Sequence, residues 1–398
     1  MGRRDQDDQS PAPGRRSFAY RIVTLLAMTV VVGLVLAACG ADSKPYSHIT
    51  PRSSTTRDIQ SLYKLVFWLA LIVFVGVQMF IVYTALRFRQ RGNEVDRPAQ
   101  IHGNKRLEIA WTLIPAAVLL VILIPTIQTM YEFSADAQEG EYIVDVYGKQ
   151  WWWEVQYPGL APNNGTLITA NEVRVPAGRK VKLQLSSNNV IHSFWAPQLF
   201  GKMDVIPGHI NEIGFTPEKP GVYYGECTEF CGVAHALMRF TIIVEPQEEF
   251  DAWVAAYNNE RPATDAKPET GDVADAPAAF GACLACHAVN NTNAVVAQAG
   301  MASNPYSQGA GPNLTLFGCR DFIGAGVLAN NKENLRTWLR NPGGVKEGNY
   351  MALLIKEGTL NDAQIEELSD YLLSLKPAAG CPEDAREQQD AQDKQGEG

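Results

Sequence analysis

Two thiols, two imidazoles and one thioether define the most informative stretch of the sequence. Three residues separate Cys227 from Cys231, His235 and Met238 follow them, and an isolated His192 precedes them. These soft or borderline donors suit copper: one cysteine with the other three makes a mononuclear site, and a second cysteine lets two sulfurs bridge two coppers. A disulfide between the cysteines and a structural zinc site are the alternatives, but neither needs the methionine.

A second cysteine pair lies nearer the C-terminus, in the motif Cys283-Leu-Ala-Cys286-His287. This C-x-x-C-H spacing is typical of c-type haem attachment: both thiols form thioethers and the histidine ligates the iron. A redox dithiol is the alternative, but it requires a βαβ pattern that the surrounding sequence lacks. Met301 and Met351 are the methionines that follow the motif, so each is a candidate for the second axial ligand.

Different elements must position these two groups. From residue 141 to residue 245, short alternating runs separated by Pro-Gly and Asn-Gly turns predict a β-sandwich, which would hold the copper ligands. Residues 277–376 contain the haem motif and would form a separate domain. The acid-rich segment 246–276, rich in Ala and Pro after an amphipathic start, predicts an extended linker that lets the haem domain move close to the copper site.

The N-terminal part predicts a membrane anchor. Uncharged runs at about 65–86 and 109–130 are each long enough to cross a bilayer, which places a transmembrane hairpin at 58–130. The arginines and lysines between the runs predict a cytoplasmic loop, so everything after residue 130 faces the external, oxidising side. A buried hairpin of a soluble protein is the alternative.

A further apolar run, Ile22–Ala38, follows several arginines and ends in Leu-Ala-Ala-Cys39. This pattern is that of an export signal, and it resembles a bacterial lipoprotein cleavage site, which implies removal of residues 1–38 and a lipid on Cys39. An uncleaved transmembrane helix is the alternative.

Charge and cysteine count narrow the functional classes. The 398-residue chain has a net charge of -9, its excess of negative charge lies in the linker and in the acidic tail 377–398, and the rest of the chain is nearly neutral, so we expect no binding to nucleic acid. Seven cysteines at such uneven spacing do not form a simple disulfide scaffold. Outside the membrane, Cys319 and Cys381 are candidates for one disulfide, and two free thiols are the alternative.

The copper motif closely resembles subunit II of haem–copper cytochrome c oxidases. Further matching motifs are Gly148–Trp153, Val190–Trp195 and Asp204–Gly208, and the hairpin matches as well. The resemblance implies a cupredoxin Greek-key sandwich with the dinuclear centre called copper A. Its ligands would be the following residues: His192, Cys227, Cys231, His235, Met238 and the backbone carbonyl of Glu229.

The same resemblance implies three further roles. Trp151 matches the residue through which an external cytochrome delivers electrons, with interface packing as the alternative. The Glu229 carboxylate would help bind a magnesium ion shared with subunit I. Glu108 matches a carboxylate at the mouth of a proton channel of subunit I, although an acid at a helix start is also favoured by the helix dipole alone.

The C-terminal part resembles the class I cytochromes c that some bacterial oxidases carry fused to subunit II, which implies an all-α domain over residues 277–376. The matching segments are Gly311–Leu314, Asn334–Leu339 and Gly348–Met351. The resemblance favours Met351 as axial ligand, although Ala352 stands where proline is usual. The Pro312 carbonyl would accept the imidazole N–H of His287.

The complete pattern predicts a multi-domain, multi-pass protein of the bacterial plasma membrane with its copper and haem domains on the periplasmic side. It would pass electrons from haem c through copper A to haem a of subunit I, where oxygen is reduced to water and protons are pumped. Expected partners are subunits I and III, the lipid bilayer, and a cytochrome c or a cytochrome bc-type complex as donor. The alternatives are the copper A subunit of a nitric-oxide reductase and a copper-delivery protein.

Overall fold

The computed structural model describes residues 25–26, 28–33, 46–89, 103–133, 142–187, 189–259, 276–289, 311–377 and 380–381. Residues 25–26 and 28–33 are helical. Cys39, Met301 and nearly all of the predicted acidic tail lie outside the described residues. The signal peptide and the lipidation of Cys39 therefore stay predictions.

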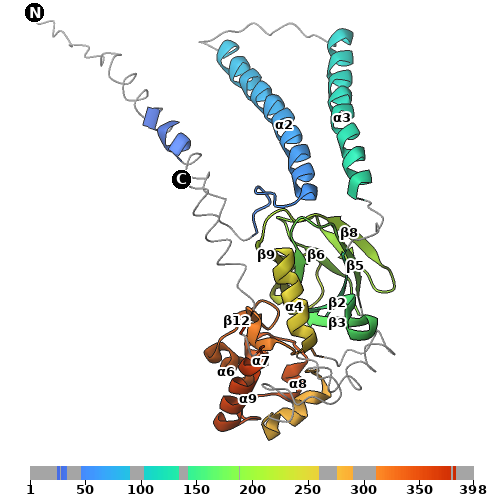
Figure 1. Ribbon diagram of the computed structural model, residues 1–398. Helices are drawn as coiled ribbons and strands as arrows, with labels where there is room; N and C mark the ends of the chain where they lie inside the picture. Colours follow the sequence, from blue (N-terminus) through green and yellow to red (C-terminus); the bar gives the residue numbers. More distant parts are fainter. Residues whose placement is uncertain are drawn as a thin grey trace, which may run out of the picture.

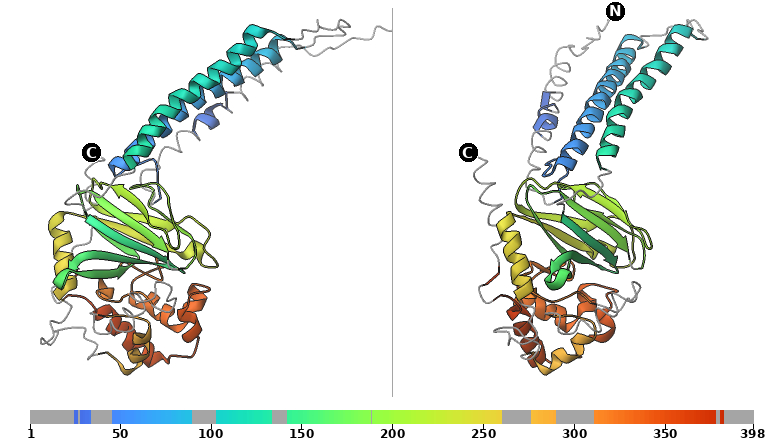
Figure 2. Two further views of the ribbon diagram at one scale, coloured as in Figure 1. Left: turned by 90° about the vertical axis from the view of Figure 1, so that its right-hand side faces the viewer. Right: turned by 45° about the vertical axis from the view of Figure 1, so that its right-hand side comes forward.

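Two long helices precede the β domain and lie side by side (Figures 1 and 2). Helix α2 runs from Ser54 to Arg87 and helix α3 from Lys105 to Phe133, and both are long and apolar enough to cross a membrane. Each extends beyond the apolar run that predicted it. The Ser53 side chain caps α2 through a capping box with Thr56, which fixes where the helix leaves the β domain.

The next segment folds into a sandwich of two five-stranded sheets, ordered β3-β2-β1-β5-β8 and β4-β10-β9-β6-β7. The alternating burial along β5, for example, follows from its alternating apolar and polar residues. The strands are β1 (Tyr142–Lys149), β2 (Trp152–Ala161), β3 (Gly165–Ala170), β4 (Glu172–Pro176), β5 (Val181–Ser187), β6 (His192–Trp195), β7 (Met203–Val205), β8 (Asn211–Phe215), β9 (Gly221–Cys227) and β10 (Arg239–Glu245).

Aromatic rings fill the space between the sheets. Trp153 packs edge-on against Phe194 and Phe240, with ring centroids 4.8 and 5.6 Å away. Phe194 and Phe240 stack on each other, and all three side chains are buried. These strands also end at the copper motif, so the rigid core directly supports it.

Helix α4 (Gln247–Asn259) packs on the sandwich and corrects one predicted boundary. Its Phe250, Trp253 and Tyr257 are buried in the sandwich core, and the Tyr257 hydroxyl donates to the Ile168 carbonyl. The predicted linker 246–276 therefore begins with a helix of the β domain. The amphipathic pattern was visible, but its large aromatic face makes docking more favourable than solvation.

The C-terminal part lies at the end of the sandwich away from the long helices (Figures 1 and 2). It is mainly helical, but it also contains the short hairpin β11–β12, which the all-α prediction did not include. Its elements are η4 (Ala278–Ala285), η5 (Phe317–Cys319), β11 (Phe322–Ile323), β12 (Leu328–Ala329), α6 (Lys332–Arg340), α7 (Pro342–Val345), α8 (Met351–Leu354) and α9 (Asp362–Ser374).

A separate core and one covalent bond hold this part together. Phe280 of η4 packs edge-on against Tyr371 of α9, with centroids 4.8 Å apart. Cys319 and Cys381 form a disulfide in the structure and so join the segment after α9 to η5. This pairing matches the one that the sequence indicated.

Candidate functional site

The four nitrogen and sulfur donors of the copper motif form a short row at one end of the sandwich. The Sγ atoms of Cys227 and Cys231 are 3.8 Å apart. His192 Nδ1 lies 3.9 Å from the sulfur of Cys227, and His235 Nδ1 lies 3.7 Å from the sulfur of Cys231. Each histidine thus approaches a different sulfur.

Two further atoms point into the same space. The Met238 sulfur is 3.9 Å from the sulfur of Cys231, and the Glu229 carbonyl oxygen is 3.3 Å from that of Cys227. The separation of the two cysteine sulfurs is far longer than the roughly 2.05 Å of a disulfide. A zinc site would leave the buried thioether of Met238 without a purpose. The donor set therefore fits two copper ions bridged by two thiolates.

His192 is fully buried and held by neighbours that the sequence did not single out. Its Nε2 lies 3.2 Å from Asn189 Oδ1, which leaves Nδ1 directed at Cys227. A Cβ atom at Gly148 would stand 2.7 Å from the imidazole, so only glycine gives the ring room. Asn189 orients a metal ligand in the way that outer partners usually do.

The two cysteines titrate as a pair. The hydrogen bond to Cys231 lowers the pKa of Cys227, and His192 adds to this effect. The same shared proton raises the pKa of Cys231. A metal ion bound by both sulfurs would favour the loss of the second proton.

Trp151 is placed against the copper loop by a tight turn. Lys149 pairs with Trp152 across the β1–β2 hairpin, so Gln150 and Trp151 form its tip. The Trp151 Nε1 and the Gln150 Nε2 both donate to the Cys231 carbonyl, at 3.1 and 2.7 Å. Asn189 in turn donates to Gln150 Oε1 at 3.1 Å, which joins the tip to the support of His192.

The haem motif lies at the end of η4. Cys283 and Cys286 are free thiols, and His287 Nδ1 lies 2.8 Å from the Pro312 carbonyl, as the sequence analysis predicted. A Cβ atom at Gly311 would lie 2.5 Å from the imidazole ring. Burial lowers the pKa of His287. The Pro312 carbonyl therefore holds the ring through Nδ1 and leaves Nε2 available, which fits an axial haem ligand.

The other axial candidate begins α8, in a loop pinned by one asparagine. Met351 is half-buried and packs against the C-terminal core. Asn349 donates to the carbonyls of Pro342 and Lys346, and its Oδ1 accepts from the Ala352 amide at 3.0 Å. Hence the loop keeps its shape although alanine replaces the usual proline. The second candidate, Met301, lies outside the described residues.

The C-terminal part contacts the β domain at Trp151. The Lys346 Nζ donates to the Trp151 carbonyl at 2.6 Å and to the Gly324 carbonyl at 2.9 Å. The ring of Tyr350 stacks on that of Trp151 at 6.4 Å and 16°. Sequence reasoning missed these contacts because a lysine in a glycine-rich loop looks solvated, and the sequence carries no signal of the partner surface.

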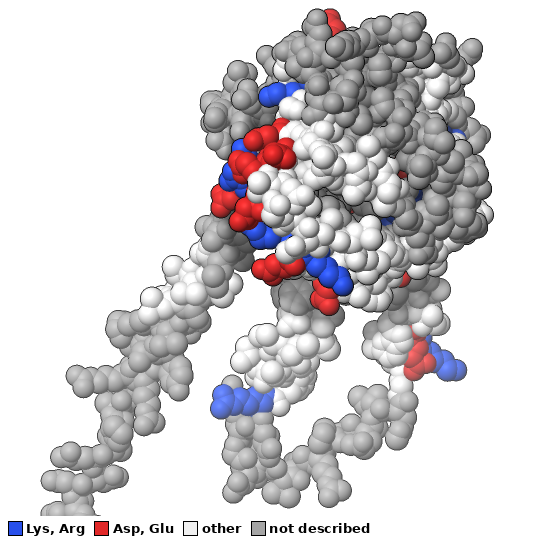
Figure 3. Space-filling view, turned by 90° about the horizontal axis from the view of Figure 1, so that it is seen from below, with Lys and Arg blue, Asp and Glu red and all other residues white. Residues whose placement is uncertain are grey.

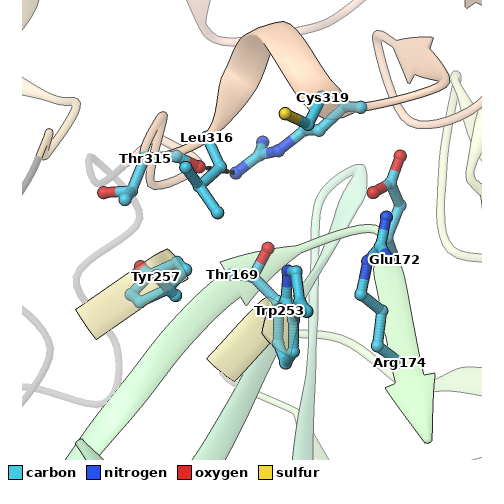
Figure 4. A pocket seen from close by; sticks show the side chains of 9 residues that line it. Thr169, Glu172, Arg174, Trp253, Tyr257, Thr315, Leu316 and Cys319 are labelled. Carbon is cyan, nitrogen blue, oxygen red and sulfur yellow. Dashed lines mark hydrogen bonds between the residues drawn. The ribbon is translucent and has the colours of Figure 1, made fainter. Parts of the chain in front are cut away.

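A second contact surrounds a small pocket between the two parts (Figure 4). Glu172 Oε1 accepts from the Asp321 amide at 2.9 Å, and burial raises the pKa of Glu172 to about 7 although the charges of Arg174 and Arg320 oppose this. The pocket is lined by the following residues: Thr169, Glu172, Arg174, Trp253, Tyr257, Thr315, Leu316, Cys319 and Arg320.

The two remaining acidic predictions lie at exposed positions. Glu108 is exposed in the first turn of α3, a position that is compatible both with a role at a proton channel and with an interaction with the helix dipole alone. The Glu229 carboxylate is exposed while its carbonyl faces Cys227.

Seen from below, charged side chains gather at one edge of the C-terminal part (Figure 3). Ion pairs between α6 and α9, such as Arg340 with Asp362, account for such mixed charge.

Comparison with known families gives two matches. Residues 49–129 match the family model for the transmembrane domain of cytochrome c oxidase subunit II, and residues 160–246 match the model for its periplasmic domain. The chain is 36% identical to cytochrome c oxidase subunit 2 of Bacillus sp. strain PS3, over 90% of this chain and 98% of that protein. Subunit 2 of Bacillus subtilis is 32% identical, with the same coverage.

Solved structures were also compared. The periplasmic domain of subunit II of cytochrome oxidase from Bradyrhizobium japonicum is 33% identical, with a TM-score of 0.27, over 29% of this chain and 91% of that chain. A haem–copper terminal oxidase is 24% identical, with a TM-score of 0.22, over 46% of this chain and 99% of that chain.

Proposed function

Because the chain belongs to the cytochrome c oxidase subunit II family, and is thus an electron-transfer subunit of a haem–copper oxidase that works with subunit I, we propose that it holds two redox groups of its own. One is a dinuclear copper centre in the sandwich. The other is a covalently attached haem c in residues 277–376. When bound, each group would carry one electron at a time, and oxygen is reduced on subunit I.

The observation that carries the copper proposal is the row His192–Cys227–Cys231–His235. Successive donor atoms in this row are 3.9, 3.8 and 3.7 Å apart, and Met238 and the Glu229 carbonyl flank it. One histidine stands at each end and the two sulfurs stand between. A single tetrahedral ion has no need of this extended arrangement, whereas a bridged pair does.

Rigid support is what this function requires of the protein. The ligands lie at the ends of β6 and β9 and just before β10, above the ring stack of Trp153, Phe194 and Phe240. Asn189 and Gln150 tie the imidazole of His192 to the copper loop. A ligand set held this way changes little in geometry on reduction, which favours fast transfer.

The haem proposal rests on the C-x-x-C-H motif and on the held imidazole of His287. The Pro312 carbonyl fixes the ring, and Gly311 leaves it room. Met351 would complete the iron coordination from its pinned loop. Trp151 is the proposed electron entry to the copper site, since it contacts the Cys231 carbonyl on one side and Tyr350 on the other.

The remaining assignments follow from the sequence. We infer a lipid anchor on Cys39, an external position for both redox domains, and contacts with subunit III and a cytochrome donor. The exposed Glu229 carboxylate would help bind magnesium against subunit I, and Glu108 would stand at a proton path. The copper-delivery alternative is disfavoured by how deeply His192 and Met238 are buried, because such ligands release metal slowly.

Two reciprocal variants test the proposal in the purified complex. Cys227→Ser should abolish the near-infrared copper band and leave the c-type spectrum intact. Cys283→Ser combined with Cys286→Ser should remove the covalent haem and keep the copper band. Metal analysis of the parent should give two coppers for each c-type haem.

Either half of the proposal can fail separately. A copper band that survives Cys227→Ser would place the metal elsewhere. A haem that remains covalently bound without Cys283 and Cys286 would refute the attachment site.

A further inference from the structure

The side chain of Lys346 reaches from the C-terminal part to the copper domain. Its side chain is only 2% exposed. Its ammonium donates to the carbonyl of Trp151 on the copper side and to the carbonyl of Gly324 on its own side. Because its two acceptors belong to different parts of the chain, this single cation joins them.

Burying that ammonium is costly. Among the described residues, its recorded partners are two neutral carbonyls rather than a carboxylate, and burial lowers the pKa of Lys346 to about 7. A methionine or leucine would fill the same space without desolvation. The arrangement therefore has a purpose beyond filling space.

The loop that carries Lys346 also carries the proposed haem ligand. Asn349 fixes the segment between Pro342 and Ala352, so Lys346, Tyr350 and Met351 move as one unit. Backbone from the neighbouring hairpin turn adds a second anchor: the Arg239 amide, one residue after Met238, donates to the Ala325 carbonyl at 3.0 Å. The C-terminal part is thus anchored at Trp151, beside the copper loop, and at Arg239, just after it.

We propose that Lys346 is a positioning residue that clamps the C-terminal part to the tip of the β1–β2 hairpin and holds Tyr350 stacked on Trp151. This role extends the proposed function, and its effect on electron transfer rests on that function. With the clamp closed, the stacked rings of Tyr350 and Trp151 bridge the loop of Met351 and the copper loop, and Gly348 of the first loop also lies close to Val233 of the second. The electron that leaves ferrous haem and reduces the oxidised copper pair crosses this fixed contact.

The test compares Lys346→Met with Lys356→Met in the full oxidase complex. Both variants lose one lysine charge, but Lys356 is exposed and lies outside the contact. The first readout is amide hydrogen exchange of the segments 148–153 and 322–328. Loss of two charge-assisted hydrogen bonds should raise exchange there about tenfold or more in Lys346→Met and leave it unchanged in Lys356→Met.

Two further readouts separate positioning from mere stability. Transfer from reduced haem to copper should slow in Lys346→Met, and the copper midpoint potential should fall because a buried positive charge near Cys231 is gone. Copper and c-type spectra serve as controls for folding. If these spectra are normal and exchange and transfer rate equal those of the parent, the clamp is refuted. Absence of the haem or copper spectrum in the parent would instead refute the proposed function.

Lys346→Gln covers the case in which Lys346→Met fails to fold. Glutamine keeps a donor but removes the charge, so it should restore part of the exchange protection and leave the copper potential lowered. If Lys346→Gln restores both the exchange protection and the copper potential in full, the charge has no role, and a clamp that depends on the ammonium is refuted.

Discussion

At the scale of single residues, chemistry is set by partners as much as by the ligands themselves. His192 would be free to rotate without Asn189, and the Cys231 carbonyl receives donors from both Gln150 and Trp151. These contacts decide which imidazole nitrogen meets the metal. Ligand type comes from the sequence motif, but ligand orientation comes from residues outside it.

Replacing Asn189 should weaken copper binding without removing a ligand. In Asn189→Ala, His192 loses the acceptor for its Nε2 proton, and we expect a roughly 10- to 100-fold loss of copper affinity. Competition with a chelator in the purified complex, followed by the near-infrared band, measures this loss. Asn211→Ala is the control, since that amide donates to Asp204 instead. Equal affinity in the two variants would contradict the role of Asn189.

At the scale of elements, strand ends and helix starts position the chemistry. The β1–β2 hairpin presents Trp151 at its two-residue tip because its register pairs Lys149 with Trp152. The last helix, α9, packs Leu368, Tyr371 and Leu372 into the core against η4, which carries the haem motif. Whatever stabilises α9 therefore stabilises the segment that carries the proposed haem site.

The cap of α9 provides a test of this dependence. The Asn361 side chain accepts a hydrogen bond from the backbone N–H of Gln364, and the Gln364 side chain accepts one from the backbone N–H of Asn361. Asn361→Ala removes the cap and should lower the free energy of unfolding of the C-terminal part by about 1 kcal/mol. Denaturant unfolding followed by haem absorbance measures it. Asn361→Asp keeps a capping oxygen and should remain close to the parent; a similar loss in both variants would reject the cap.

At the scale of the whole molecule, two contacts dock the C-terminal part on the sandwich. One joins Lys346 and Tyr350 to Trp151, and the other places Glu172 against the Asp321 amide. An acid-rich linker by itself predicts free movement. The structure instead buries an ammonium and a carboxyl group at the junction, which gives the docking a preferred geometry.

The buried carboxyl group makes this docking depend on pH. The pKa of Glu172 rises from 4.5 to about 7 on folding, so it is protonated in both states below pH 4.5 and contributes no penalty there. As pH rises from 4.5 to about 7, the unfolded chain loses this proton while the folded protein keeps it, so the stability falls by up to about 3 kcal/mol and levels off above about pH 7. The groups that face it are Arg174, Arg320 and Asp321.

Glu172→Gln should remove that fall, since the amide keeps the acceptor for Asp321 but never ionises. Melting temperatures of the solubilised protein at pH 5 and pH 8 test this. The parent should lose more stability than the variant over this interval. Glu212→Gln, an exposed acid paired with Lys182, is the control. Parallel pH profiles in parent and Glu172→Gln would contradict the assignment.

The sequence by itself determined the local and periodic features. Donor spacing in the copper motif and in C-x-x-C-H predicted both sites, because ligand chemistry depends on residue type and short separations. Apolar runs predicted α2 and α3, and alternation predicted the sandwich, because both follow from burying one face of an element. Pro312 as the acceptor for His287 was also foreseen.

Only the tertiary structure decided which surfaces meet. The linker's aromatic residues became the buried face of α4, and a lysine in a glycine-rich loop became a buried contact with Trp151. Asn189 and Gln150 gained their roles because β6 and the β1–β2 tip converge. Such pairings depend on the three-dimensional approach of segments far apart in the chain, and no local pattern of residue types records that approach.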